Sequence, residues 1–346
     1  MNHKNLINET LQKWEINIDI LDVYSRWSET QRYYHTIEHL NQILNELVLN
    51  YKNFFSPTDF ETLVISAIFH DIVYDPKSKT NEEDSIRYFV NSFSSSKKLY
   101  LGSIKDSKEN TVINIIRMTK THEPKTKLEE IFCELDLKVL TYDLPELLKW
   151  EEQIQKEYEF ANWKIYKRER IKILKSFLNN VSKINKQGIE HLIYIIENKE
   201  PSIAIYAGSF NPFTIAHKNI VDKSLKIFDK VIIAKGRNDS KNINEEEFER
   251  EFQNLVKLYP TNEILEYSGL LTDVLKEQEG KITLVRGLRN GYDLEAENVL
   301  ITYMKDMLPT LSVVYIPCDK EYEHISSTAV RSLRKHGEHL ITRYLP

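Results

Sequence analysis

The sequence predicts two domains of different class: an all-α domain, followed by an α/β domain built on a doubly wound parallel sheet. Three observations support this prediction. The chain has 346 residues, which is more than a single hydrophobic core usually organises. Apolar residues recur at helical spacing through the first half. After about residue 200, short strand-like runs alternate with amphipathic helical stretches, as in parallel sheets covered by helices on both faces.

The helical spacing also gives the expected domain limits. Between Ile37 and Leu47, and again between Leu63 and Ile68, apolar side chains fall on one helical face. A weaker helical pattern continues from Lys183 and stops before Pro201, and the residue before a proline disfavours helix. We therefore expect a helical domain over residues 1–182, a helical linker over 183–200 and an α/β domain over 201–346.

Five short apolar runs are the expected strands of the second domain. They are Ile203–Tyr206, Val231–Ala234, Ile264–Tyr267, Ile282–Val285 and Val313–Ile316. Parallel sheets of this kind bind their ligands at the carboxyl ends of the strands. Residues that directly follow these runs are therefore the first candidates for a functional site.

Composition excludes several classes of partner. The formal charge of −5 provides no basic field for a nucleic acid backbone. No apolar run approaches the roughly 20 residues that a membrane helix needs, and the N-terminus lacks the apolar segment of a secretory signal. The two cysteines, Cys133 and Cys318, fall in different predicted domains and suggest no disulfide. We expect a cytoplasmic protein that acts on small molecules, without nucleic acid or membrane.

The first strand of the second domain leads into a turn and then a helix. Gly208 would let the backbone approach a ligand closely, and His217 would stand in the first turn of the helix. The free N–H groups and the dipole at a helix start favour phosphate. Taken alone, His217 could equally be a residue that only caps or packs the helix.

Two other strand-to-helix junctions carry groups that suit phosphate. Arg286 and Arg289 follow the fourth strand, where guanidinium groups can bind phosphate oxygens in pairs. Three hydroxyl residues, Ser326–Thr328, open the last long helix and can supply both a cap and phosphate contacts. Three such junctions in one sheet predict a polyphosphate site.

At these residues the chain from Ile203 onward resembles phosphopantetheine adenylyltransferase, a member of the nucleotidyltransferase superfamily. The resembling motifs are GSFNPFT followed by His217, Ser240-Lys241, Ser268–Leu271 with Asp273, RGLR with Asp293, Glu295 and Glu297, and ISSTxVR. The resemblance implies a Rossmann-like domain and transfer of AMP from ATP, with Mg²⁺, to 4′-phosphopantetheine. It also implies a homo-oligomer. One departure is Ala216, which occupies the glycine position of the family's T/HxGH signature.

The resemblance also implies roles for individual residues. His217 would steady the transferring phosphoryl group, and Lys241 and Arg286 would act on phosphates with it. The implied nucleotide contacts are Gly208, Ser209, Phe210, Thr214, Arg289, Glu297, Ser326, Ser327 and Thr328. The implied acceptor contacts are Ser209, Lys241, Leu271 and Arg286. No protein nucleophile is needed, because the acceptor phosphate can attack the α-phosphorus directly. An alternative acceptor is nicotinamide mononucleotide or a related phosphate.

The first half holds a second group of candidate residues. Histidines and carboxylates suit a divalent transition metal, and the ones in question are His35, His39, His70, Asp71 and Asp136. His35 and His39 are four residues apart and would share one face of a helix. Any one of these residues could instead be an ordinary core or surface group.

The spacing of these residues resembles predicted metal-dependent phosphohydrolases of the HD superfamily. The shared elements are Tyr34–His39, Phe69–Pro76, Asn81–Ser85, Thr119–His122 and Glu134–Leu137. The resemblance implies that His39, His70, Asp71 and Asp136 bind Mn, Fe, Co, Ni or Zn, with His35 either replacing His39 or supporting the site. Such a metal would activate a water for attack on a phosphate ester of unknown identity. The alternative is a regulatory or binding module without catalysis.

Overall fold

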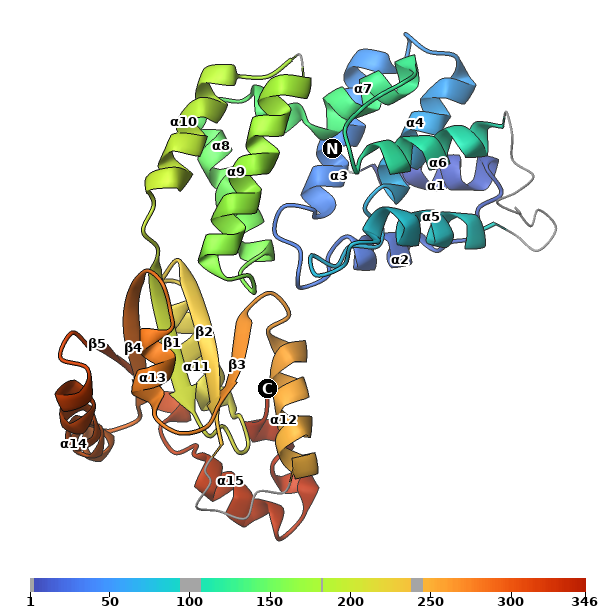
Figure 1. Ribbon diagram of the computed structural model, residues 1–346. Helices are drawn as coiled ribbons and strands as arrows, with labels where there is room; N and C mark the ends of the chain where they lie inside the picture. Colours follow the sequence, from blue (N-terminus) through green and yellow to red (C-terminus); the bar gives the residue numbers. More distant parts are fainter. Residues whose placement is uncertain (1–2, 94–106, 182, 238–244) are drawn as a thin grey trace. The chain divides into compact units, whose positions relative to one another are not determined.

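The computed structural model describes residues 3–93, 107–181, 183–237 and 245–346. The chain divides into two compact units (Figure 1). The N-terminal unit comprises Met1–Tyr158 and Glu169–Glu197, and the C-terminal unit comprises Glu159–Arg168 and Asn198–Pro346. Within the described ranges, no helix is both long enough and apolar enough to span a membrane.

The described chain before Ser202 is helical and contains no β-strand. Its helices are α1 (Lys4–Lys13), α2 (Ile20–Arg26), α3 (Ile37–Glu46), the π-helical turn η1 (Leu47–Tyr51), α4 (Pro57–Phe69), α5 (Asn81–Asn91), α6 (Lys108–Met118), α7 (Lys127–Asp136), the 3₁₀ turn η3 (Lys138–Thr141), α8 (Leu144–Glu157), α9 (Trp163–Asn180) and α10 (Lys186–Asn198). The expectation of a helical first half is confirmed.

Helix α4 forms the centre of the N-terminal core. Its start is well defined, because Ser56 accepts a hydrogen bond from the Asp59 backbone N–H and Pro57 is the first helical residue. Every residue from Thr62 to Phe69 is buried, so the helix is covered on all sides. Helix α4 ends inside the core. His70 and Asp71, which directly follow it, therefore lie in the interior of the unit.

The C-terminal unit contains a sheet of five parallel strands in the order β3-β2-β1-β4-β5. The strands are β1 (Ser202–Gly208), β2 (Lys230–Gly236), β3 (Glu263–Tyr267), β4 (Lys281–Leu288) and β5 (Ser312–Pro317). Each contains one of the five apolar runs, so the prediction of a parallel sheet is confirmed. The central strand β1 has β2 and β4 as its neighbours, and the carboxyl ends of all three strands therefore lie together.

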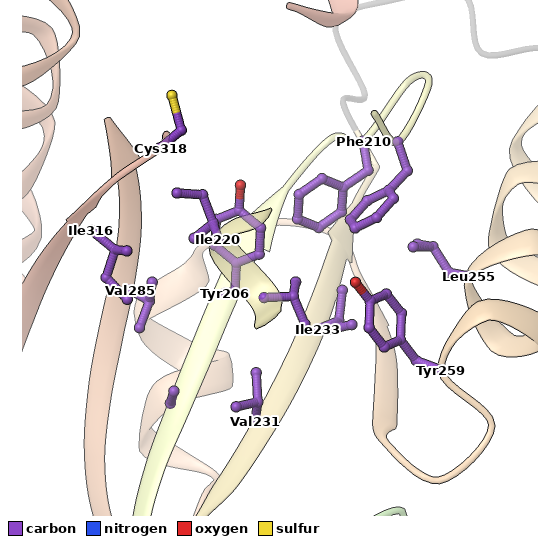
Figure 2. Packing of buried hydrophobic residues seen from close by; sticks show 13 residues of the cluster. Tyr206, Phe210, Ile220, Val231, Ile233, Leu255, Tyr259, Val285, Ile316 and Cys318 are labelled. Atoms are coloured by element: carbon purple, nitrogen blue, oxygen red, sulfur yellow. The ribbon is translucent and has the colours of Figure 1, made fainter. Parts of the chain in front are cut away.

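Helices cover both faces of this sheet. They are α11 (Ile215–Ser224), α12 (Glu245–Leu258), α13 (Leu271–Lys276), α14 (Gly291–Met307) and α15 (Ser327–Arg334), with short 3₁₀ turns η4 (Lys320–Tyr322), η5 (Glu338–Leu340) and η6 (Thr342–Tyr344). Residues of α11 and α12 pack on one face, where Figure 2 shows Ile233, Leu255 and Tyr259 in one cluster with Phe210. Residues of α13 and α14, such as Leu275 and Ile301, pack on the other face.

A short segment after α8, Glu159–Arg168, which includes the start of α9, belongs to the C-terminal unit. The Glu159 carboxylate accepts a hydrogen bond of 2.7 Å from the backbone N–H of Val231, and the Lys230 amine donates to the carbonyl of Ala161 at 2.6 Å. Both contacts are made at the amino end of β2. The limit near residue 182 that the sequence suggests places this segment in the first domain, whereas the compact units place it with the sheet.

Candidate functional sites

A cavity of about 340 Å³ lies at the carboxyl ends of β1 and β4. The β1–α11 turn, the end of β4 and the start of α15 all contribute to its wall. Ten of the residues predicted for the nucleotide site line this cavity: Gly208, Ser209, Phe210, His217, Arg286, Arg289, Glu297, Ser326, Ser327 and Thr328. The parallel sheet brings them together, because strand ends that are neighbours in the sheet are far apart in the sequence.

Three other predicted residues are placed differently. Thr214 is fully buried and is not among the residues that line the cavity; it is the N-cap of α11. Leu271 is the first residue of α13 and does not line the cavity either. Lys241, together with Ser240, lies outside the described residues, so its predicted role stays a prediction.

His217 is held in one tautomer by the start of its own helix. The backbone N–H of Thr214 donates to His217 Nδ1 at 3.0 Å, and Thr214 Oγ1 lies 3.1 Å from the same nitrogen. Burial, together with the charge of Arg289, lowers the pKa of His217 to about 4. The imidazole is therefore neutral near pH 7, with Nδ1 as an acceptor and Nε2 carrying the hydrogen. A neutral N–H donor stands at the wall of the cavity.

The two arginines of the cavity are oriented by carboxylates from α14. Arg286 binds Glu297 through two hydrogen bonds of 2.5 and 2.7 Å, and it also donates to the carbonyl of Ala207. Arg289 binds Asp293 in the same paired manner, at 2.9 and 2.8 Å. Paired bonds fix the plane of a guanidinium group. Glu297 is thus the ion-pair partner of Arg286 in this structure.

The three hydroxyl residues at the start of α15 make different hydrogen bonds. Ser326 is the N-cap and accepts a hydrogen bond from Ala329 N, as the sequence predicted. Ser327 Oγ donates to the carbonyl of Pro212 at 2.9 Å, which joins α15 to the β1–α11 turn. Thr328 Oγ1 accepts from Arg331. The first-turn N–H groups of α15 therefore border the same cavity as His217.

Comparison with known proteins defines the class of this unit. Residues 205–333 match the cytidylyltransferase-like family. Among solved structures, this chain resembles a putative nicotinate-nucleotide adenylyltransferase from Vibrio parahaemolyticus, with 16% identity, a TM-score of 0.30 and coverage of 42% of this chain and 86% of that chain. It also resembles the nicotinic acid mononucleotide adenylyltransferase of Plasmodium falciparum, with 20% identity, a TM-score of 0.30 and coverage of 42% and 90%. The family match assigns residues 205–333 to a nucleotidyltransferase domain of the cytidylyltransferase-like class.

Curated proteins of similar sequence show to which family within this class the C-terminal unit belongs. The phosphopantetheine adenylyltransferase of Porphyromonas gingivalis is 39% identical over 148 residues, which span 42% of this chain and 94% of that protein. The phosphopantetheine adenylyltransferase of Desulforamulus reducens is 37% identical over 133 residues, which span 38% of this chain and 82% of that protein. Through its C-terminal unit, the chain belongs to the phosphopantetheine adenylyltransferase family.

A second cluster of candidate residues lies in the core of the N-terminal unit. His39 comes from α3, His70 follows α4 and Asp136 ends α7. One possible ligand atom from each of the three lies within 4.8 Å of the others. Asp136 Oδ1 is 3.1 Å from His39 Nε2 and 3.5 Å from His70 Nε2. Three helices that are remote in sequence thus bring together two histidines and a carboxylate, a donor set typical of transition metals.

His70 faces two carboxylates in this cluster. His70 Nδ1 lies 3.0 Å from the carbonyl of Ala67, so it carries the hydrogen. His70 Nε2 lies 3.2 Å from Asp71 Oδ2 and 3.5 Å from Asp136 Oδ1. Burial alone would lower the pKa of His70, but these two carboxylates raise it to about 10. Near pH 7, Nε2 therefore carries a proton that faces the two carboxylates.

His35 and His39 do not share a helix, and that prediction is wrong. Helix α3 begins at Ile37, and His35 lies in the turn before it. His35 Nε2 is 4.0 Å from Asp71 Oδ2, while its Nδ1 is 2.7 Å from Glu157 Oε2. The three closest ligand candidates include His39 and not His35. His35 stands beside the cluster, on the Asp71 side.

Glu157 is the residue that sequence reasoning missed. Its buried carboxylate accepts hydrogen bonds from the backbone N–H groups of Tyr33, Tyr34 and His35, and also from Tyr74 Oη. These bonds fix the turn that carries His35, and the bond to Nδ1 fixes the orientation of its ring. No sequence signal points to Glu157, because it is one of several glutamates near the end of α8, more than 100 positions from the turn.

Proposed function

We propose that the C-terminal unit transfers AMP from ATP to 4′-phosphopantetheine, giving dephospho-coenzyme A and pyrophosphate. The observation that carries the proposal is the single cavity at the ends of β1 and β4, which gathers the β1–α11 turn, His217, two oriented arginines and the start of α15. Membership of the phosphopantetheine adenylyltransferase family supports it independently.

The chemistry asks the protein for positioning and for charge stabilisation. The acceptor phosphate attacks the α-phosphorus of ATP, the bond to the β-phosphate breaks, and pyrophosphate leaves. The Nε2–H group of His217, which lines the cavity, would donate to an oxygen of the transferring phosphoryl group. Arg289 would bind phosphate oxygens through Nη1, because Asp293 takes only its Nε and Nη2. Arg286 donates with all three nitrogens, to Glu297 and to the carbonyl of Ala207, and would act on phosphate through the remaining Nη hydrogens. Mg²⁺ that enters with ATP would neutralise the leaving pyrophosphate.

Turnover with different acceptors tests the proposal. With ATP, purified protein should release pyrophosphate with 4′-phosphopantetheine at a kcat/KM at least about 100-fold above that with nicotinamide mononucleotide, since each missing contact in a polar site costs about tenfold or more. Omitting the acceptor gives the background rate. A preference for nicotinamide mononucleotide would assign the same site to a different acceptor and contradict the proposal.

We further propose that the N-terminal unit is a metal-dependent phosphohydrolase. His39, His70 and Asp136 would hold a divalent transition metal, and Asp71, whose Oδ2 is 3.2 Å from His70 Nε2, would join them. The residues fit such an ion, because burial lowers the pKa of His39 and keeps its ring a neutral ligand. His70 Nε2 faces two carboxylates, so a metal ion could take the place of the proton that it carries. A bound metal lowers the pKa of a water that can attack a phosphate ester.

A non-catalytic role is the second candidate for this unit. His35, Asp71, His122 and Asp136 keep between 12% and 21% of their side-chain surface exposed, so one side of the cluster is open to a ligand. A regulatory module would bind the metal and a ligand there without turnover. Metal binding and hydrolysis are therefore measured separately.

We also propose that the protein is a homo-oligomer and that α14 forms part of its interface. Only Ile301 and Met304 of this 17-residue helix are buried. Val299 and Tyr303, which lie one turn apart, are 61% and 65% exposed. Apolar side chains gathered on one exposed helical face usually mark a contact surface.

Charged residues introduced on the exposed face of α14 should prevent the subunits from associating. The double variant Val299→Lys, Tyr303→Lys should sediment as a monomer in analytical ultracentrifugation, because two buried lysines in an interface cost far more than their exposed forms. Ile227→Lys is the matched control, since Ile227 is 61% exposed in the same unit but lies outside α14. A wild type that sediments as a monomer, or an unchanged assembly in the double variant, would contradict the proposal.

A further inference from the structure

A buried lysine lies directly behind the β1–α11 turn. Lys235 is the penultimate residue of β2, follows the buried apolar run Ile232–Ala234 and is 1% exposed. Its amine donates to the carbonyl of Ser209 at 3.1 Å and to the carbonyl of Phe210 at 3.2 Å. Lysine is rarely buried unless its charge is well accommodated. This one is held by two consecutive carbonyls of the turn that lines the cavity.

The next two carbonyls of the turn accept hydrogen bonds from side chains of another element. The carbonyl of Asn211 accepts from Arg331, and that of Pro212 accepts from Ser327 Oγ. Four consecutive carbonyls are thus held from outside the turn, two by β2 and two by α15. Lys235 is the only one of these donors that does not come from α15.

These contacts fix the direction of the N–H groups. In a trans peptide the C=O and the following N–H point in opposite directions. Because the carbonyls of Ser209 and Phe210 accept hydrogen bonds from Lys235, the N–H groups of Phe210 and Asn211 point away from this lysine. Neither N–H group donates a hydrogen bond to a described residue. Phe210 has φ of +44°, in the left-handed region. One left-handed residue in such a turn lets consecutive N–H groups converge on an anion.

We propose that Lys235 is a positioning residue of the nucleotide site: it holds the carbonyls of Ser209 and Phe210 at the back of the turn so that the N–H groups of Phe210 and Asn211 bind phosphate oxygens. The proposal rests on the proposed adenylyl transfer. Lys235 does not line the cavity, so it acts through the turn and not by touching substrate. Without its amine, two buried carbonyls would lack donors, and the turn would rearrange to find others.

A second buried lysine in the same strand offers a matched control. Lys230 is 4% exposed and donates to the carbonyl of Ala161, but it lies at the opposite end of β2 and does not line the cavity. Lys235→Met and Lys230→Met each remove one buried amine from β2. Lys230→Met also breaks the ion pair with Glu263, so a general loss of stability should be at least as large in Lys230→Met as in Lys235→Met. Loss of phosphate positioning should affect only Lys235→Met.

The experiment is titration of the full chain with pyrophosphate by calorimetry, with circular dichroism as the check of folding. We expect Lys235→Met to weaken pyrophosphate binding about tenfold and to raise the KM for ATP by a similar factor. Lys230→Met should leave both within about twofold of wild type. If Lys235→Met does not fold, Lys235→Gln takes its place, because its shorter neutral side chain cannot reach both carbonyls; we expect it to weaken binding at least about fivefold.

The proposal would be overturned by a folded Lys235 variant that binds pyrophosphate as wild type does, or by equal losses in the Lys230 and Lys235 variants. Wild-type protein that binds no pyrophosphate would also overturn it, because the N–H groups would then hold no phosphate. Wild-type protein that binds pyrophosphate but does not use 4′-phosphopantetheine would remove the proposed transferase function instead. In that case the two lysine variants still decide the role of Lys235.

Discussion

Replacement of His217 by alanine should lower acceptor-dependent pyrophosphate release about 100- to 1000-fold, which is the usual effect of removing one well-placed donor to a developing negative charge. The reason lies in the geometry. The N-cap contacts of Thr214 engage His217 Nδ1, so Nε2–H is the only donor of the ring. The effect should fall on kcat with little change in the KM for ATP, since this donor acts on the transferring phosphoryl group.

The protonation state of His217 gives this prediction a pH dependence. Burial lowers its pKa to about 4, so the ring stays neutral from pH 6 to pH 8. The ratio of wild-type to His217→Ala rates should therefore be the same at both pH values, within about twofold. An imidazolium donor with an ordinary pKa would lose its charge over this range, and the ratio would fall more than about tenfold between pH 6 and pH 8.

The control for this experiment is His336→Ala, because His336 is an exposed histidine of the same unit that does not line the cavity. Its rate should equal that of wild type. Taking the ratio at each pH cancels the titration of the substrates, which is common to both proteins. A His217→Ala variant with the wild-type rate would mean that the cavity binds nucleotide without transferring AMP.

Loss of one carboxylate should remove the metal from the N-terminal unit. Wild-type protein, stripped with a chelator and reloaded, should bind one Mn²⁺ or Co²⁺ per chain in this unit, and Asp136→Asn should weaken that affinity more than about 100-fold. Asp136 lies at the centre of the cluster, with His39, His70 and His122 all within 3.5 Å of its oxygens. Burial alone would raise its pKa, but these histidines hold the pKa of Asp136 well below its usual range.

Glu134→Gln is the matched control, because Glu134 is in the same helix and its carboxylate faces Lys183 at the surface. This variant should bind metal as wild type does. Hydrolysis of a panel of phosphate esters is then compared between the metal-loaded and stripped proteins. Metal-dependent turnover that disappears in Asp136→Asn supports a phosphohydrolase, whereas metal binding without turnover supports a regulatory module. Wild-type protein that takes up no transition metal contradicts both.

Much of the C-terminal site follows from local sequence patterns. Strand-like runs identified β1 to β5, and the residues that follow β1 and β4 line the cavity because parallel strands end at a common edge. The N-cap role of Ser326 follows equally from a short pattern. These features depend on residues that are neighbours along the chain, so the sequence contains the information directly.

The N-terminal cluster was predictable only in part. His39, His70, Asp71 and Asp136 stand out by residue type and spacing, and the structure brings them together. The prediction that His35 and His39 share one helix was wrong, because α3 begins only at Ile37. The turn before α3 donates three backbone hydrogen bonds to Glu157. A spacing of four residues cannot distinguish a helix from a turn held by a distant side chain.

By itself, the sequence determined the two classes of domain, the order of strands and helices along the chain, and the motifs that carry the candidate chemistry. These depend on periodicity and on residue type over a few neighbouring positions. Tertiary structure alone decided the partners of the buried charges: Glu157 with the turn before α3, Lys235 with the β1–α11 turn, and Glu159 with the amino end of β2. A buried charge must find its partner in space, and that partner can lie anywhere along the chain.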